Sequence, residues 1–176
     1  MMIAVHKMEF SIFFLIILKS YFINGKIIYV MEECRVRYMG LDLGTKTLGI
    51  ALSDRTGIIA SSYGTIRFEN EDYDSLLPKV KEIVDNENVD IIVLGLPLNM
   101  NNSMGERANK TIIFKDKLSS YLNKEVFLQD ERLSSVEANN YLIEADMSRK
   151  KRKMKVDGIA ATIILETFME RRKNNE

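Results

Sequence analysis

The chain has 176 residues, of which 46% are hydrophobic and 28% charged, with 25 basic and 25 acidic side chains. This composition is typical of a globular protein with one full core, and the zero net charge excludes a global field that attracts nucleic acid. A single cysteine, Cys34, excludes an internal disulfide and a cysteine-based zinc site, and it suits a reducing compartment. His6 lies outside the patterned region, so catalysis must use carboxylates, hydroxyls, lysines or arginines.

The first 35 residues differ from the rest of the chain. Phe10–Leu18 is an apolar run, but a membrane-spanning helix needs about 20 such residues, and no small-residue cleavage site for a signal peptide follows it. Met31-Glu-Glu33 can be encoded by a purine-rich ribosome-binding sequence just upstream of Val36. We therefore hypothesise that residues 1–35 are a non-native or poorly ordered extension, and that residues 36–176 form one domain.

From Val36 onward the apolar pattern predicts three strands, at Val36–Leu43, Thr47–Ser53 and Gly57–Ile66. Gly44 can take the positive φ of a hairpin turn between the first two. Apolar residues then recur at helical spacing from Leu76 to Val84. Asp90–Leu96 is a continuous apolar run, which is typical of a strand buried on both faces.

The second half alternates helices and strands. After a polar loop at Leu98–Gly105, we expect a helix through Thr111–Tyr121 and a short strand at Val126–Glu131. Ser134 and Glu137 form a capping box that starts another helix. The segment from Met147 to Lys155 resembles a basic hinge, and a last helix should run from about Val156 to Arg172.

This order of elements predicts an α/β fold. Three strands in a meander followed by helix–strand units give a five-stranded mixed sheet, whose first three strands are antiparallel, with helices on both faces. The arrangement matches the ribonuclease H-like fold.

Acidic residues fall at comparable places in this fold. Asp42 ends the first strand, Asp130 and Glu131 end the last strand, and Asp157 opens the final helix. Asp157 begins a helical stripe of apolar residues, so its carboxylate should face the sheet rather than solvent; the stripe continues through Ala161, Ile164 and Phe168. Adjacent strand residues point to opposite faces, so only one of Asp130 and Glu131 should join Asp42, and we expect Glu131 with its longer side chain.

Converging carboxylates repel each other unless a cation lies between them. We therefore expect Asp42, Glu131 and Asp157 to bind Mg²⁺ or Mn²⁺, with Asp130 a further catalytic candidate. Two such ions, about 3.5–4 Å apart, support phosphodiester hydrolysis. The alternative is a set of helix-cap and turn acids that never meet.

A cluster of cations lies beside these acids in the sequence. Six of the seven residues from Arg149 to Lys155 are basic, and such a block is usually a solvated segment. Next to converging acids it would hold a phosphate backbone, and without aromatic residues it would not stack on bases. The candidate nucleic-acid-binding residues are Lys46, Arg107, Arg132, Arg149, Lys150, Lys151, Arg152, Lys153 and Lys155.

Four segments resemble the signatures of the bacterial pre-16S rRNA nuclease family, which is also described as a family of Holliday junction resolvases. They are Gly40-Leu-Asp-Leu-Gly-Thr-Lys-Thr-Leu-Gly-Ile-Ala51, Gly95-Leu-Pro-Leu-Asn-Met100, Asp130-Glu-Arg-Leu-Ser134 and Val156-Asp-Gly-Ile-Ala-Ala-Thr-Ile-Ile-Leu-Glu166. The resemblance spans Val36 to about Lys173. It implies a cytoplasmic, metal-dependent nuclease that matures the 5′ end of 16S rRNA, with precursor rRNA and the ribosomal small subunit as partners and no membrane attachment. It also assigns Asp42, the Asp130/Glu131 pair and Asp157 to acidic motif positions.

Three other functions compete with this one. A structure-specific DNA endonuclease that cuts four-way junctions would use the same acids. The Asp-Leu-Gly-Thr segment also resembles the phosphate-binding hairpin of sugar kinases and actin-like ATPases, but about 140 patterned residues are too few for their second lobe. A non-catalytic ribosome-assembly factor would bind RNA without using the acids.

Overall fold

The computed structural model of the chain describes residues 16–23, 26–33, 36–69, 71–99, 101, 103–131 and 149–174. For residues 16–33 and 149–155 it describes the backbone alone. No helix in these parts of the chain is both long and apolar enough to cross a membrane.

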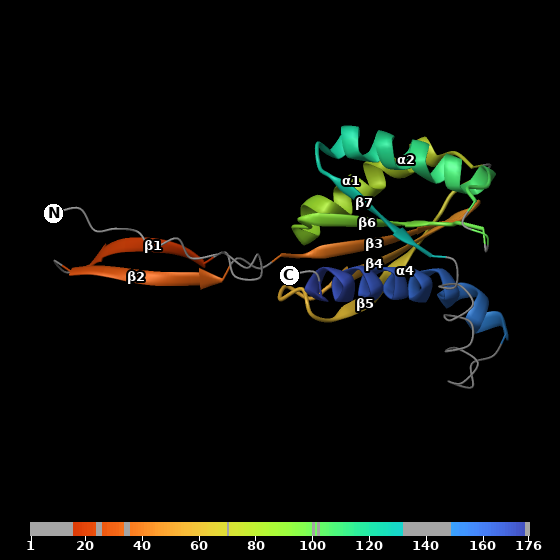
Figure 1. Ribbon diagram of the computed structural model, residues 1–176. Helices are drawn as coiled ribbons and strands as arrows, with labels where there is room; N and C mark the ends of the chain where they lie inside the picture. The colour runs from red at the N-terminus through yellow and green to blue at the C-terminus, as the bar shows by residue number, and fades with distance from the viewer. Residues whose placement is uncertain are drawn as a thin grey trace.

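Five strands form one mixed sheet in the order β5-β4-β3-β6-β7 (Figure 1). The strands are β3 (Tyr38–Leu43), β4 (Thr47–Ser53), β5 (Ala60–Arg67), β6 (Ile91–Leu96) and β7 (Val126–Asp130). β3, β4 and β5 are antiparallel neighbours, whereas β6 runs parallel to β3 and β7 runs parallel to β6. The predicted five-stranded sheet with an initial meander is therefore confirmed.

Helices cover both faces of this sheet. α1 (Leu76–Glu87) and α2 (Glu106–Leu122) pack on one face, and α4 (Arg149–Asn174) packs on the other (Figure 1). A 3₁₀ turn, η1 (Tyr73–Ser75), leads into α1. Pro78 is tolerated because it lies in the first turn of α1, where its missing N–H has no helical partner.

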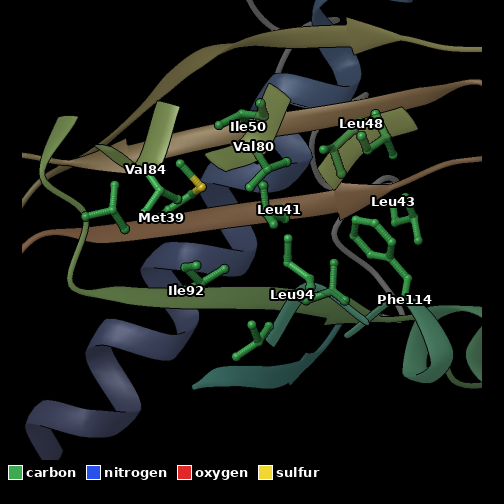
Figure 2. Packing of buried hydrophobic residues seen from close by; sticks show 14 of the residues in the cluster. Met39, Leu41, Leu43, Leu48, Ile50, Val80, Val84, Ile92, Leu94 and Phe114 are labelled. Atoms are coloured by element: carbon green, nitrogen blue, oxygen red, sulfur yellow. The ribbon is translucent and has the colours of Figure 1, made fainter. Parts of the chain in front are cut away.

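The central strand β3 divides its side chains between the two faces. Those directed to α1 and α2 belong to the larger core and are at most 4% exposed; they are Met39, Leu41 and Leu43. Figure 2 shows them packed with apolar side chains of β4, β6, α1 and α2. The alternate residues, Tyr38, Gly40 and Asp42, face α4, because successive side chains of a strand point to opposite sides. One strand thus fills a core and directs a carboxylate away from it.

α4 lies very close to the sheet because small residues meet at the contact. A Cβ atom at Gly40 would lie only 2.7 Å from the carbonyl oxygen of Ala161, so a larger residue there would push the helix away. The predicted inward stripe of this helix is confirmed, since Ala161 and Ile164 are buried and Phe168 packs against the same cluster.

Residues before the domain form strands that the sequence did not predict. β1 (Ile16–Ile23) and β2 (Lys26–Glu33) pair antiparallel in a two-stranded sheet of their own, separate from the five-stranded one (Figure 1).

The basic segment before Asp157 is not a hinge. α4 begins at Arg149 rather than near Val156, so Arg149–Lys155 forms its first turns and Asp157 lies within the helix instead of opening it. Lysine and arginine are good helix formers, and the segment contains no glycine or proline to interrupt them. The helix predicted from Ser134 lies outside the described residues.

Candidate active site

The candidate site lies where three parallel strands end. β3, β6 and β7 run in the same direction, so their carboxyl ends meet at one edge of the sheet. Asp42 is the penultimate residue of β3 and is only 7% exposed. Glu131 directly follows β7, and its backbone N–H donates to the carbonyl of Leu96 at the end of β6 (3.2 Å). The edge therefore collects carboxylates from segments far apart in the sequence.

Asp157 lies over the β3–β4 pair, on the same face of the sheet as Asp42. Asp42 lies opposite Gly49 in the register of the two strands. The backbone of Asp157 rests on Gly49 so closely that a Cβ atom there would come within 2.5 Å of the Asp157 carbonyl carbon. Burial and repulsion from the Asp157 carboxylate both raise the pKa of Asp42. The contact at Gly49 is what brings the helix carboxylate to the strand carboxylate.

Glu131 approaches the same face from the other side of β3. Its carboxyl group lies over Gly95 of β6, where a Cβ atom would come within 2.8 Å of the Glu131 carboxyl carbon. Burial raises the pKa of Glu131, and repulsion from Asp42 raises it further. Asp130 ends β7 and, by strand alternation, points toward the opposite face. The geometry thus brings Glu131, and not Asp130, beside Asp42.

Arg107 is the basic side chain at this acidic edge. It lies in the first turn of α2, and its Nη2 donates to the carbonyl oxygen of Leu43, the residue after Asp42 (3.3 Å). Its positive charge lowers the pKa of both Asp42 and Glu131, against the larger effect of burial. Among the predicted nucleic-acid contacts whose side chains the structure describes, Arg107 is the one whose charge acts on the acids.

Two exposed cations lie at the same end of the sheet as Asp42, on the β4–β5 side. Lys46 lies in the turn between β3 and β4, and its carbonyl accepts a hydrogen bond from Phe68 N–H (3.0 Å). Arg67, at the end of β5, pairs in register with Thr47, two residues before Gly49. Because cross-strand partners share a face, Arg67 lies on the α4 side of the sheet, as Asp42 does. Sequence analysis missed Arg67, although the strand alternation that starts from Asp42 could have found it.

The remaining predicted contacts are Arg132 and the basic residues at the start of α4. Arg132 lies outside the described residues. The six basic residues from Arg149 to Lys155 lie in the first two turns of α4.

Comparison with known proteins identifies the family. Residues 36–171 match the family model described as "RuvX: Holliday junction resolvase". This chain belongs to that family. Relatives named "Putative pre-16S rRNA nuclease" from Clostridium botulinum strain Hall and Geobacillus sp. strain WCH70 are each 45% identical over 135 residues, which is 77% of this chain and 97% and 98% of theirs.

Solved structures support the fold of this RuvX family member. RuvC from Thermus thermophilus, determined in complex with a Holliday junction substrate, superposes with a TM-score of 0.51 at 12% identity, over 78% of this chain and 96% of RuvC. The predicted ribonuclease H-like fold is confirmed by this likeness and by the strand order. The protein is a nuclease by family, and the fold is one that generally works with divalent metal ions.

The donor set at the edge fits such ions. Three carboxylates supply only hard oxygen ligands, which Mg²⁺ and Mn²⁺ prefer. Burial and mutual repulsion make Asp42 and Glu131 hold protons more tightly than usual, and a divalent cation would remove that repulsion. Within the part of the chain that the structure describes, no three acidic, histidine or cysteine side chains are gathered tightly enough to hold an ion.

Proposed function

We propose that this chain is a metal-dependent nuclease that matures the 5′ end of 16S rRNA, and that Asp42, Glu131 and Asp157 hold its metal ions. The observation that supports this most strongly is the burial of Asp42 at a sheet edge beside two other carboxylates, Glu131 and Asp157. Such a cluster costs stability in the metal-free protein, which is expected of a site retained for binding cations. The names of the relatives supply the substrate.

The ions would be Mg²⁺ or Mn²⁺, bound as a pair. The chemistry that such a pair supplies is activation of a water molecule and stabilisation of the leaving oxygen in phosphodiester hydrolysis. The protein contributes the fixed position of Asp42 on the central strand and the cations that hold the nucleic-acid backbone. Phosphates on either side of the cleaved bond would be neutralised by Lys46, Arg67 and part of the basic start of α4.

A cleavage assay with matched variants tests the proposal. Purified protein should cut precursor 16S rRNA in Mg²⁺ or Mn²⁺ and fail to cut it in EDTA. Asp42→Asn and Asp157→Asn should lose cleavage while still binding the RNA. Asp85→Asn, which removes an exposed acid of α1, should cut like the wild type. Cleavage by both site variants at the wild-type rate would refute the assignment.

A four-way DNA junction is the second candidate substrate. The family description and the fold shared with RuvC favour it. Parallel reactions on precursor rRNA and on junction DNA, at equal protein and metal concentrations, separate the two substrates. Binding of rRNA without cleavage of either would instead support a ribosome-assembly factor that has no catalytic activity.

The remaining proposals concern partners and domain extent. An enzyme with this substrate would work in the cytoplasm, and the ribosomal small subunit is its expected second partner. We also propose that residues 36–176 are sufficient for activity and that residues 1–35 are dispensable, because the family match begins at residue 36. A variant that starts at Val36 should cut at the rate of the full chain; loss of cleavage would show that the preceding residues take part.

A further inference from the structure

Arg107 differs from the other cations of α2 in how it is held. Lys110 pairs with Glu71 (2.7 Å) and Glu106 (2.9 Å), and Lys117 pairs with Asp74 (2.6 Å). Arg107 has no ion pair within 4 Å among the residues that the structure describes, and its Nη2 donates a hydrogen bond to the Leu43 carbonyl (3.3 Å). It is also exposed to solvent. Its guanidinium is therefore near the acids without being fixed to any of them.

The position of this guanidinium matters because of what lies beside it. Its hydrogen-bond acceptor, Leu43, is adjacent to Asp42, and its charge acts on both Asp42 and Glu131. Asp42 is buried and Glu131 is half-buried. Carboxylates in such positions cost stability, and a positive charge at intermediate distance reduces that cost. Divalent cations at the same carboxylates would repel the guanidinium. Arg107 and the ions therefore compete for the same negative charge.

We infer that Arg107 is an exchangeable counter-ion, which stabilises Asp42 and Glu131 in the metal-free protein and binds a substrate phosphate once divalent cations have replaced it. The inference rests on the proposed nuclease function and deepens it by coupling metal binding to substrate binding. A guanidinium suits the second role because its planar set of N–H donors matches two phosphate oxygens at once. Its exposure leaves it free to turn from the Leu43 carbonyl to the substrate.

The first test measures metal binding without any nucleic acid. Mn²⁺ is titrated into the metal-free wild type, Arg107→Gln and Lys117→Gln, and free Mn²⁺ is followed by electron paramagnetic resonance. Loss of the competing charge should make Arg107→Gln bind Mn²⁺ about 3- to 10-fold more tightly. Lys117→Gln removes the same charge from the same helix, about 15 Å further along its axis, and should bind like the wild type.

The second test separates charge from geometry. Arg107→Lys keeps the positive charge and should bind Mn²⁺ within about twofold of the wild type, but it loses the paired donors. With metal present it should cleave precursor rRNA about 10-fold more slowly or worse, and Arg107→Gln about 100-fold more slowly despite its tighter metal binding. Arg107→Gln should also unfold at a lower temperature than the wild type in EDTA. Addition of Mn²⁺ should raise its unfolding temperature by more than that of the wild type.

The outcomes distinguish this inference from the proposed function. Unchanged or weaker Mn²⁺ binding by Arg107→Gln would overturn the counter-ion role alone, and wild-type cleavage rates in Arg107→Lys would overturn the role at the phosphate. If Arg107→Gln does not fold, Arg107→Met supplies the neutral variant for the same titration. Absence of Mn²⁺ binding by the wild type would overturn the metal site itself, and this inference with it.

Discussion

The two faces of the sheet are built on different principles. On the α1/α2 face, β3 and β4 present large aliphatic side chains, which fill a core with residues from both helices (Figure 2). On the α4 face, the same two strands present Gly40, Asp42 and Gly49, and a helix backbone lies almost directly on them. The first face is held by large apolar side chains, whereas the second combines a smaller apolar cluster with close backbone contacts at Gly40 and Gly49.

This difference explains how one small sheet can be stable and still hold a buried carboxylate on one of its faces. Buried apolar area on the α1/α2 face supplies most of the favourable free energy of folding. The α4 face can therefore tolerate a buried carboxylate whose pKa is raised by its surroundings. Substitutions on the first face should change stability, and substitutions on the second should change activity or the position of α4.

The largest expected effect contrasts neighbours on opposite faces of β3. Asp42→Asn should lower the cleavage rate by about 10³-fold or more, because a ligand for the ions is lost, while leaving the fold intact. Leu41→Ala should lower the free energy of unfolding by about 2–5 kcal/mol, because it opens a cavity in the larger core, while the folded fraction stays active. Cleavage rates and urea unfolding curves of both variants check this. A Leu41→Ala variant that is as stable as the wild type but inactive would contradict the assignment of stability to the α1/α2 face and of activity to the α4 face.

The next contrast uses two glycines of neighbouring strands. Gly49→Ala should lower the free energy of unfolding by about 3 kcal/mol and reduce activity, because the new Cβ atom meets the backbone of Asp157 and displaces α4. Gly64→Ala is the matched control, since nothing lies within 4 Å of its Cβ position, and it should change stability by about 0.5 kcal/mol or less. If urea titrations give the same decrease in the free energy of unfolding for both variants, strand propensity rather than the helix contact explains the effect.

The pH dependence of the metal-free protein should report the cost of the acidic face. The pKa values of Asp42 and Glu131 are higher in the folded protein than in the unfolded chain, so the folded state holds protons that the unfolded chain has already released. Stability in EDTA should therefore fall as the pH rises from about 4 to 8. Asp42→Asn should remove part of this fall. Its free energy of unfolding should be about 2 kcal/mol higher than that of the wild type at pH 8 and no higher at pH 4.

Chemical denaturation at the two pH values measures this effect. Asp85→Asn, at an exposed acid of α1, controls for the general loss of a negative charge and should show no such gain. A wild type whose stability does not decrease between pH 4 and 8 would contradict the raised pKa values.

The smallest expected effect concerns substrate binding beside the acids. Arg67→Ala should weaken binding of precursor rRNA about 3- to 10-fold and make its salt dependence shallower, because one phosphate contact is lost. Arg171→Ala removes the same charge near the other end of α4, 14 residues beyond Asp157, and should leave binding unchanged. Equal weakening by the two variants, measured across a salt titration, would point to a general electrostatic effect.

Much of this fold could be predicted from local patterns. The alternation in β3 and the continuous apolar run of β6 determine strand type, and the stripe from Asp157 to Phe168 determines which side of α4 meets the sheet. The start of α4 was misjudged because a run of like charges was interpreted as a solvated hinge, although lysine and arginine favour helix. The hairpin of β1 and β2 was missed because residues 1–35 were interpreted as a non-native or poorly ordered extension.

The candidate site was predictable only in part. Strand ends and helix stripes were enough to nominate Asp42, Glu131 and Asp157, because sheet topology brings such positions to one edge. The roles of Gly49 and Gly95 were not predictable, since they depend on how closely α4 and Glu131 approach particular strands. Arg67 was missed for a related reason: its proximity to the acids comes from pairing between β4 and β5, which a single strand pattern does not reveal.

Core side chains and Asp42 alternate along β3, so a change in the register of the strand affects the core and the candidate site together. Insertion of one residue between Met39 and Asp42 would move every later side chain of the strand to the opposite face of the sheet. A leucine would then face α4, and the aspartate would point into the hydrophobic core against α1 and α2. Length changes in this lineage should consequently accumulate in the connecting loops, whereas β3 keeps a constant count of residues. The packing of the hydrophobic core thus fixes the position of the candidate catalytic carboxylate of Asp42.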